Sequence, residues 1–94
     1  MSVSARHLDR VASLGCVLCR HLGQGATPAQ VHHLREGQGM GQRADDFLTI
    51  PLCPEHHTGQ SGIHGMGRKA FERAYLPEMD LLAMTIELLE KDRS

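Results

Sequence analysis

Apolar residues follow a helical period at both ends of the chain. A stripe near the N-terminus predicts a helix over residues 4–14, with Ser4 as its N-cap. Toward the C-terminus the same spacing predicts helices over residues 68–75 and 78–91, which Pro77 separates. Both ends of the chain are therefore expected to be helical.

The middle of the chain has a different pattern, with short apolar runs between glycines. Residues 30–35 and 47–52 are predicted to be two strands of a hairpin, joined by a long glycine-containing connection. The remaining predicted segments are a turn over residues 16–19, a loop over 21–28 and a short helix over 53–58. Together these elements indicate an α+β fold in which N- and C-terminal helices flank a hairpin.

The composition narrows the class of protein. The chain of 94 residues allows one small domain, residues 1–94, with two Phe, one Tyr and no Trp for its core. We expect a cytoplasmic protein without a membrane partner, because there is no signal-peptide pattern and no run near the ~20 apolar residues of a membrane span. The net charge is −1, so contact with nucleic acid would require a local basic patch, a bound cation or a partner protein.

Cysteines and histidines are concentrated in a few short segments. A structural zinc is held by pairs of Cys or His ligands from separated segments. Cys16, Cys19 and Cys53 supply three ligands, and the fourth is His56 or His57. We prefer His56, because its spacing from Cys53 matches the spacing of the first pair. The alternative is a redox Cys-x-x-Cys pair with an unrelated Cys53, but no thioredoxin-like pattern surrounds the motif.

Four histidines remain after this assignment: His32, His33, His57 and His64. Three imidazoles can hold one divalent ion with open positions, and the fourth can act as a general base, because the unperturbed pKa of imidazole lies near neutrality. Neighbouring side chains on a strand point to opposite faces, so the adjacent pair can serve one site only at a strand end or an irregularity. Asp46 is a candidate to orient the basic histidine. The alternative for each of these residues is an ordinary surface position.

The cysteine and histidine spacing resembles that of the HNH, or ββα-metal, endonucleases in their zinc-knuckle form. The resemblance is closest to the phage-type Ref proteins, recombination-enhancement nucleases that act with RecA filaments. Three segments carry the closer match: Ile50-Pro51-Leu52-Cys53-Pro54-Glu55-His56-His57, Gly62-Ile63-His64-Gly65-Met66-Gly67-Arg68-Lys69-Ala70-Phe71-Glu72 and Asp80-Leu81-Leu82-Ala83. With the N-terminal cysteine pair, the match extends over residues 16–86.

The resemblance implies a role for individual residues. His33 occupies the position of the water-activating histidine, and His32 that of a metal ligand on the strand, which is more often Asp in other members. His57 and His64 occupy further metal-ligand positions. Asp46 lies near the usual Asn position, two residues out of register with it.

The function expected from this pattern is metal-dependent hydrolysis of DNA phosphodiester bonds, linked to recombination, with a RecA filament as the first candidate partner. Imidazole ligands suit a transition metal better than Mg²⁺, and the candidates for the catalytic ion are Mg²⁺, Mn²⁺, Ni²⁺ and Zn²⁺. The candidate phosphate contacts are Arg35, Arg43, Arg68 and Lys69. Two alternatives are a non-catalytic zinc-binding module that recruits protein or nucleic acid, and a hydrolase that acts on a small molecule.

Overall fold

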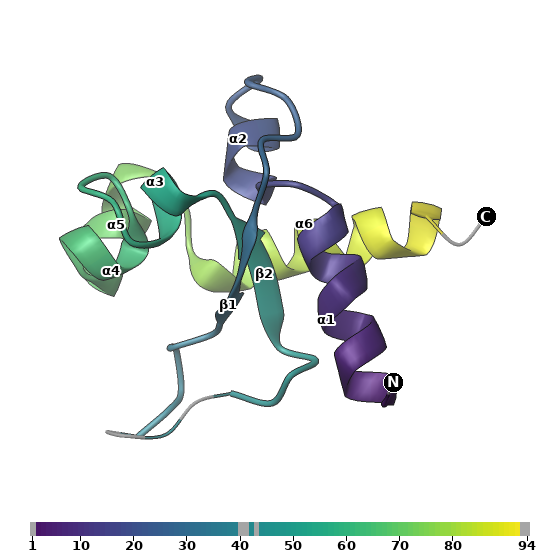
Figure 1. Cartoon of the computed structure of the whole chain (residues 1–94). Helices are drawn as coiled ribbons and strands as arrows, with labels where there is room; N and C mark the ends of the chain where they lie inside the picture. The colour runs from purple at the N-terminus through teal and green to yellow at the C-terminus, as the bar shows by residue number, and fades with distance from the viewer. Residues whose placement is uncertain (1, 40–41, 43, 93–94) are drawn as a thin grey trace.

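The computed structural model describes residues 2–39, 42 and 44–92, which are arranged around a two-stranded sheet (Figure 1). Strands β1 (Gln30–His33) and β2 (Thr49–Leu52) run antiparallel, and His33 at the end of β1 lies opposite Thr49. The helices of the described residues are α1 (Val3–Ser13), α2 (Val17–His21), α3 (Pro54–His57), α4 (Ile63–Met66), α5 (Arg68–Ala74) and α6 (Glu78–Asp92). The predicted α+β class is confirmed at this level.

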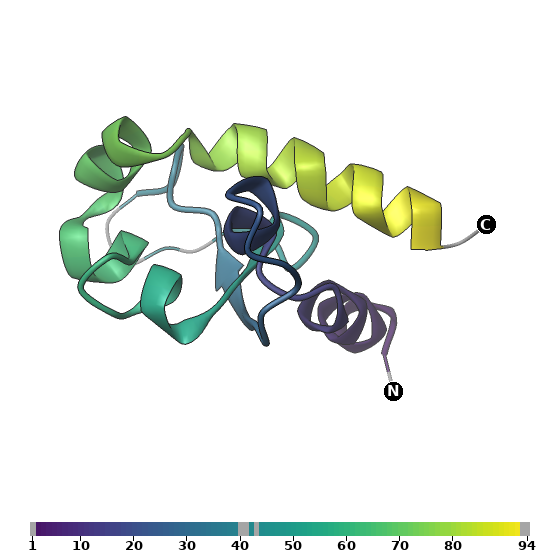
Figure 2. The same ribbon diagram turned by 90° about the horizontal axis from the view of Figure 1, so that it is seen from above.

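Helices cover both sides of β2. All four residues of β2 are buried, as expected for a strand covered on both faces, whereas His32 is the one fully buried residue of β1. The main core packs Leu18 of α2, Ile50 of β2, Phe71 of α5 and Leu81 of α6 together. Helix α6 runs along one side of the molecule, and the C-terminal part of α6 meets α1 (Figure 2). A smaller apolar cluster that includes Val11 joins these two helices.

Several element boundaries differ from the sequence prediction for local reasons. Helix α1 begins one residue earlier than expected, because the hydroxyl of Ser2, not Ser4, caps it by accepting a hydrogen bond from the Ala5 amide at 3.1 Å. Residues 16–19 were predicted to be a turn but belong to α2 and its N-cap. The Cys16 sulfur accepts a hydrogen bond from the Cys19 amide at 3.4 Å, which starts the helix.

Other differences concern the hairpin and the glycine-rich stretch. Both strands are two residues shorter than predicted at the end next to their connection. Helix α4 was not predicted, because its sequence contains Gly65 and glycine disfavours helix. The structure forms this turn of helix against α3 instead. No helix in the described part of the chain has the length and apolar character that a bilayer span requires.

Candidate functional site

Three cysteines and one histidine form a buried cluster. The donor atoms of Cys16, Cys19, Cys53 and His56 lie within 4.8 Å of one another. The sulfurs of Cys19 and Cys53 are 3.8 Å apart, and His56 Nδ1 lies 3.3–3.8 Å from the three sulfurs. A zinc tetrahedron with Zn–S bonds of about 2.3 Å and Zn–N bonds of about 2.0 Å has S···S edges of about 3.8 Å and S···N edges of about 3.5 Å. This cluster, which we call the Cys3His site, is therefore able to hold a structural metal such as zinc.

Secondary structure brings each pair of this site into place. Cys16 and Cys19 are the N-cap and first turn of α2, so their side chains share one face. Cys53 ends β2 and is the N-cap of α3, and His56 is buried within that helix. Burial raises the pKa of the Cys16 thiol to about 11. A bound divalent cation would offset this cost, because it stabilises the thiolate.

A second cluster, which we call the three-histidine site, includes His57, the neighbour of His56 in α3. Ligand atoms of His32, His57 and His64 lie within 4.8 Å of one another. The ring centroids are 5.3 Å apart for His32 and His57, 5.1 Å for His32 and His64, and 4.8 Å for His57 and His64. Thus His56 points to the cysteines and its neighbour His57 points to the other two histidines, which separates the two sites.

Glycines allow the close backbone contact that places His64 beside His57. A Cβ atom on Gly62 would lie 2.7 Å from the Glu55 carbonyl oxygen and 2.8 Å from the backbone of His56. A Cβ atom on Gly65 would overlap the Gly59 carbonyl oxygen. Because only glycine fits at these positions, α4 can lie directly against the end of α3.

Two of the three imidazoles have one ring nitrogen held by a side chain. His32 Nε2 lies 2.6 Å from Glu78 Oε2, and His57 Nδ1 lies 2.8 Å from Gln30 Oε1. Such contacts orient metal-binding histidines and leave the opposite ring nitrogen for the ion. The remaining nitrogens are therefore Nδ1 of His32 and Nε2 of His57.

The electrostatic environment lowers the pKa of two imidazoles in this site, His57 and His64. Burial, followed by the nearby His32 and His64, lowers the pKa of His57 to about 4. Burial also lowers the pKa of His64, and the nearby His32 and Arg35 add to this effect while Glu78 opposes it. Neutral imidazole is the form that binds a metal.

Glu78 remains ionised although it is fully buried. Burial by itself raises the pKa of this carboxyl. Hydrogen bonds from His32 and from the amides of Glu36 and Arg35 outweigh burial, so that the pKa is lowered overall.

His33 and Asp46 form a separate pair at the end of the hairpin. His33 Nε2 lies 2.8 Å from Asp46 Oδ1, and both side chains are partly exposed. His33 is the last residue of β1. A position at the end of the strand is what would allow His33 and His32 to serve the same site. Within the described residues, its ring is not part of the three-histidine cluster.

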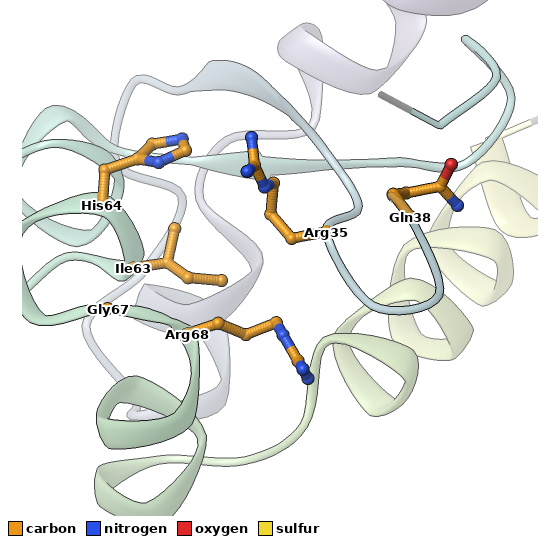
Figure 3. A pocket seen from close by; sticks show the side chains of 6 residues that line it. All are labelled: Arg35, Gln38, Ile63, His64, Gly67 and Arg68. Atoms are coloured by element: carbon orange, nitrogen blue, oxygen red, sulfur yellow. The ribbon is translucent and has the colours of Figure 1, made fainter. Parts of the chain in front are cut away.

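An open hollow adjoins the three-histidine site. It has a volume of about 420 Å³, and its lining residues are Arg35, Gln38, Ile63, His64, Gly67 and Arg68. His64 and Arg35 extend toward one another from opposite sides of this hollow, and Arg68 lies on a third side (Figure 3). Lys69 is exposed at the start of α5 but does not line it, and Arg43 lies outside the described residues.

Two polar residues at this site were not expected from the sequence. Glu78 is the first residue of α6, where a carboxylate ordinarily indicates only a favourable interaction with the helix dipole. Gln30 is an exposed residue at the start of β1. Neither belongs to a metal-binding motif, so only the tertiary structure reveals their contacts with the histidines.

The fold and its two clusters define a small α+β protein with a buried Cys3His site and a second histidine cluster beside an open hollow. A family model described as "Recombination enhancement, RecA-dependent nuclease" matches residues 2–90. The chain therefore belongs to this family of RecA-dependent nucleases, as the sequence resemblance predicted. A search of curated proteins gave no match. Membership of a nuclease family makes the protein an enzyme whose substrate is nucleic acid.

Proposed function

We propose that the protein is a metal-dependent DNA endonuclease of the HNH, or ββα-metal, type that acts in recombination. The observation that carries this proposal is the convergence of three imidazoles beside a hollow lined by two arginines. The chain order of β1, β2 and α3 also supports it, because β1 contributes His32 and α3 contributes His57 to one site. The Cys3His site would hold structural zinc and fix the start of α3.

The three-histidine site fits a divalent cation. Its donor nitrogens lie close together, and two of the rings are oriented by hydrogen bonds through their other nitrogens. A cation bound there would stabilise negative charge on the scissile phosphate and on the leaving 3′ oxygen. A set of imidazole donors favours Mn²⁺, Ni²⁺ or Zn²⁺ over Mg²⁺.

His33 is the proposed general base. Its Nε2 is engaged by Asp46, which holds the ring and leaves Nδ1 to accept a proton from the attacking water. Consecutive Cα atoms are about 3.8 Å apart. Because His33 ends β1, a phosphodiester lying across this end of the strand would contact both His33 and the site that includes His32.

Arg35 and Arg68 are the proposed phosphate contacts. Both line the hollow beside His64, and a guanidinium group binds a phosphate through two parallel hydrogen bonds. The Arg68 guanidinium also contacts Glu72 at 3.1 Å and Glu36 at 3.7 Å, so it enters the hollow with its orientation already restricted. Arg35 and Arg68 would together supply local positive charge for DNA, although the net charge of the chain is −1.

Plasmid nicking tests the proposed function. Protein that carries the structural zinc is assayed with added Mg²⁺, Mn²⁺, Ni²⁺ or Zn²⁺ on bare duplex, single-stranded DNA and RecA-coated DNA at near-physiological salt. We expect metal-dependent cleavage, strongest on RecA-coated DNA, and its loss in His64→Ala. His21→Ala is the matched control, because His21 is an exposed histidine of α2 outside both clusters.

The outcomes separate the parts of the proposal. Fast cleavage of bare duplex would reject dependence on RecA and leave the nuclease chemistry standing. Absence of cleavage with every ion and substrate would favour a non-catalytic zinc-binding module. Equal activity of His64→Ala and His21→Ala would remove the three-histidine site from the mechanism.

A further inference from the structure

Glu78 belongs to no metal-binding motif, yet its carboxylate contacts His32 and the backbone of Arg35 and Glu36. Its side chain is 0% exposed, which is rare for a carboxylate. We propose that Glu78 is a positioning residue that selects the metal-binding tautomer of His32 and holds the two arginines of the hollow in place. This inference rests on the proposed function and assigns a residue to it that belongs to no sequence motif.

The hydrogen bonds of Glu78 determine which nitrogen of His32 carries the proton. Glu78 Oε1 accepts hydrogen bonds from the amides of Arg35 at 2.9 Å and Glu36 at 2.8 Å, and Oε2 lies 3.0 Å from the same Arg35 amide. An ionised carboxylate can only accept hydrogen bonds, so His32 Nε2 donates to Glu78 Oε2 at 2.6 Å. In the neutral ring the proton then lies on Nε2, and Nδ1 carries the lone pair that can bind an ion.

The same residue is connected to both arginines of the hollow. Its carboxylate binds the backbone of Arg35 directly. Its backbone amide donates a hydrogen bond to Glu72 Oε2 at 2.8 Å, and Glu72 Oε1 accepts one from Arg68 Nη1 at 3.1 Å. Displacement of Glu78 would therefore alter a metal ligand and the two candidate phosphate contacts together.

Glu78→Gln separates the role in tautomer selection from a role in folding. The variant has nearly the same shape, and its amide oxygen can keep the hydrogen bonds from Arg35 and Glu36. Its NH₂ group then faces His32 Nε2 and can only donate, so Nε2 must become the acceptor and the ring proton moves to Nδ1. That tautomer cannot bind an ion through Nδ1, although the backbone contacts remain.

The experiment measures metal binding and the His32 tautomer without DNA. Zinc-loaded protein is titrated calorimetrically with Mn²⁺ or Ni²⁺, and two-bond ¹H–¹⁵N spectra of the ion-free three-histidine site locate the ring proton. For Glu78→Gln we expect affinity to fall about 10- to 100-fold, the proton to move from Nε2 to Nδ1, and the zinc content and melting temperature to stay near wild type. Glu72→Gln is the matched control. It should retain the affinity and tautomer, because the Glu78 carboxylate is unchanged, but raise KM for DNA, because it removes the negative charge that pairs with Arg68.

Several results would overturn the inference. Unchanged metal affinity in Glu78→Gln, or an unchanged His32 tautomer, would show that Glu78 does not select the ligand form. If Glu78→Gln does not fold, the wild-type spectrum provides the test. A proton on Nδ1 of His32 in the wild type would contradict the inference. Absence of DNA cleavage by the wild type would contradict the proposed nuclease function without changing these binding results. Failure of the proposed function and failure of the Glu78 inference can therefore be distinguished.

Discussion

The adjacent histidines of α3 allow a sharp test of the Cys3His site. His56 lies 3.3–3.8 Å from three cysteine sulfurs, whereas His57 lies in the three-histidine site. We expect His56→Ala to lose the structural zinc and to unfold. We expect His57→Ala to keep the zinc and the fold and to lose the ion of the three-histidine site. The two variants change the same residue type one position apart, so each controls for the other.

The expected magnitude for His56→Ala follows from the size of the domain. At about 0.05–0.15 kcal/mol per residue, a chain of this length has a total stability of roughly 5–14 kcal/mol. Zinc contributes about 10–16 kcal/mol of apparent binding free energy in small zinc-dependent domains at neutral pH. Loss of the zinc is therefore comparable to the whole stability of the fold, and the variant should be largely unfolded at 25 °C.

The assay combines zinc stoichiometry with thermal denaturation. Each protein is dialysed against a weak chelator, its bound zinc is measured by elemental analysis, and its unfolding is followed by circular dichroism. One tightly bound zinc and a wild-type melting curve in His56→Ala would refute the assignment of the fourth ligand. Loss of that zinc in His57→Ala would show that the two histidines have exchanged roles.

Three further predictions concern the base, the effect of pH and the phosphate contacts. His33→Ala should reduce nicking about 10²- to 10⁴-fold with unchanged metal affinity in calorimetry; loss of the ion would make His33 a ligand instead. The pKa of His57 is lowered from 6.5 to about 4 in the folded protein, so the unfolded chain binds a proton on His57 at higher pH than the folded protein does. Protein without an ion in the three-histidine site should therefore lose stability as pH falls from 6.5 to 4. In urea unfolding, His57→Gln should lose less stability over this pH range than the wild type does. Identical curves of unfolding free energy against pH for the two proteins would contradict this prediction. Arg35→Ala and Arg68→Ala should each reduce the slope of log affinity against log salt by about one. The control Lys91→Ala, at an exposed residue of α6, should leave the slope unchanged.

Much of the fold and of the clusters could be predicted from local sequence. The helices at the two ends follow from apolar stripes whose period is a property of the helix itself. The pairs Cys16–Cys19 and Cys53–His56 each lie three residues apart, so one turn of backbone is enough to bring their donors together. Spacing also favoured His56 over His57 as the cysteines' partner, and the structure has this arrangement.

Contacts between distant segments could not be predicted in this way. The sequence does not show that the two ligand pairs meet in one buried site, because Cys19 and Cys53 are 34 positions apart. It also does not show that α4 forms on the glycine-rich stretch and carries His64 to His57. Both depend on how helices and strands pack, and packing overrides the low helix propensity of glycine.

Glu78 shows the limit of sequence analysis most clearly. At the start of a helix it has the sequence signature of an ordinary first-turn acid, and 46 residues separate it from His32. Its role arises because α6 is placed against the end of β1, which buries the carboxylate beside the His32 ring and the amides of Arg35 and Glu36. Periodicity and motif spacing determine helices and ligand pairs because these are short-range properties of the chain. The partners of a buried charge depend on the tertiary structure, because burial is decided by segments that are distant in the sequence.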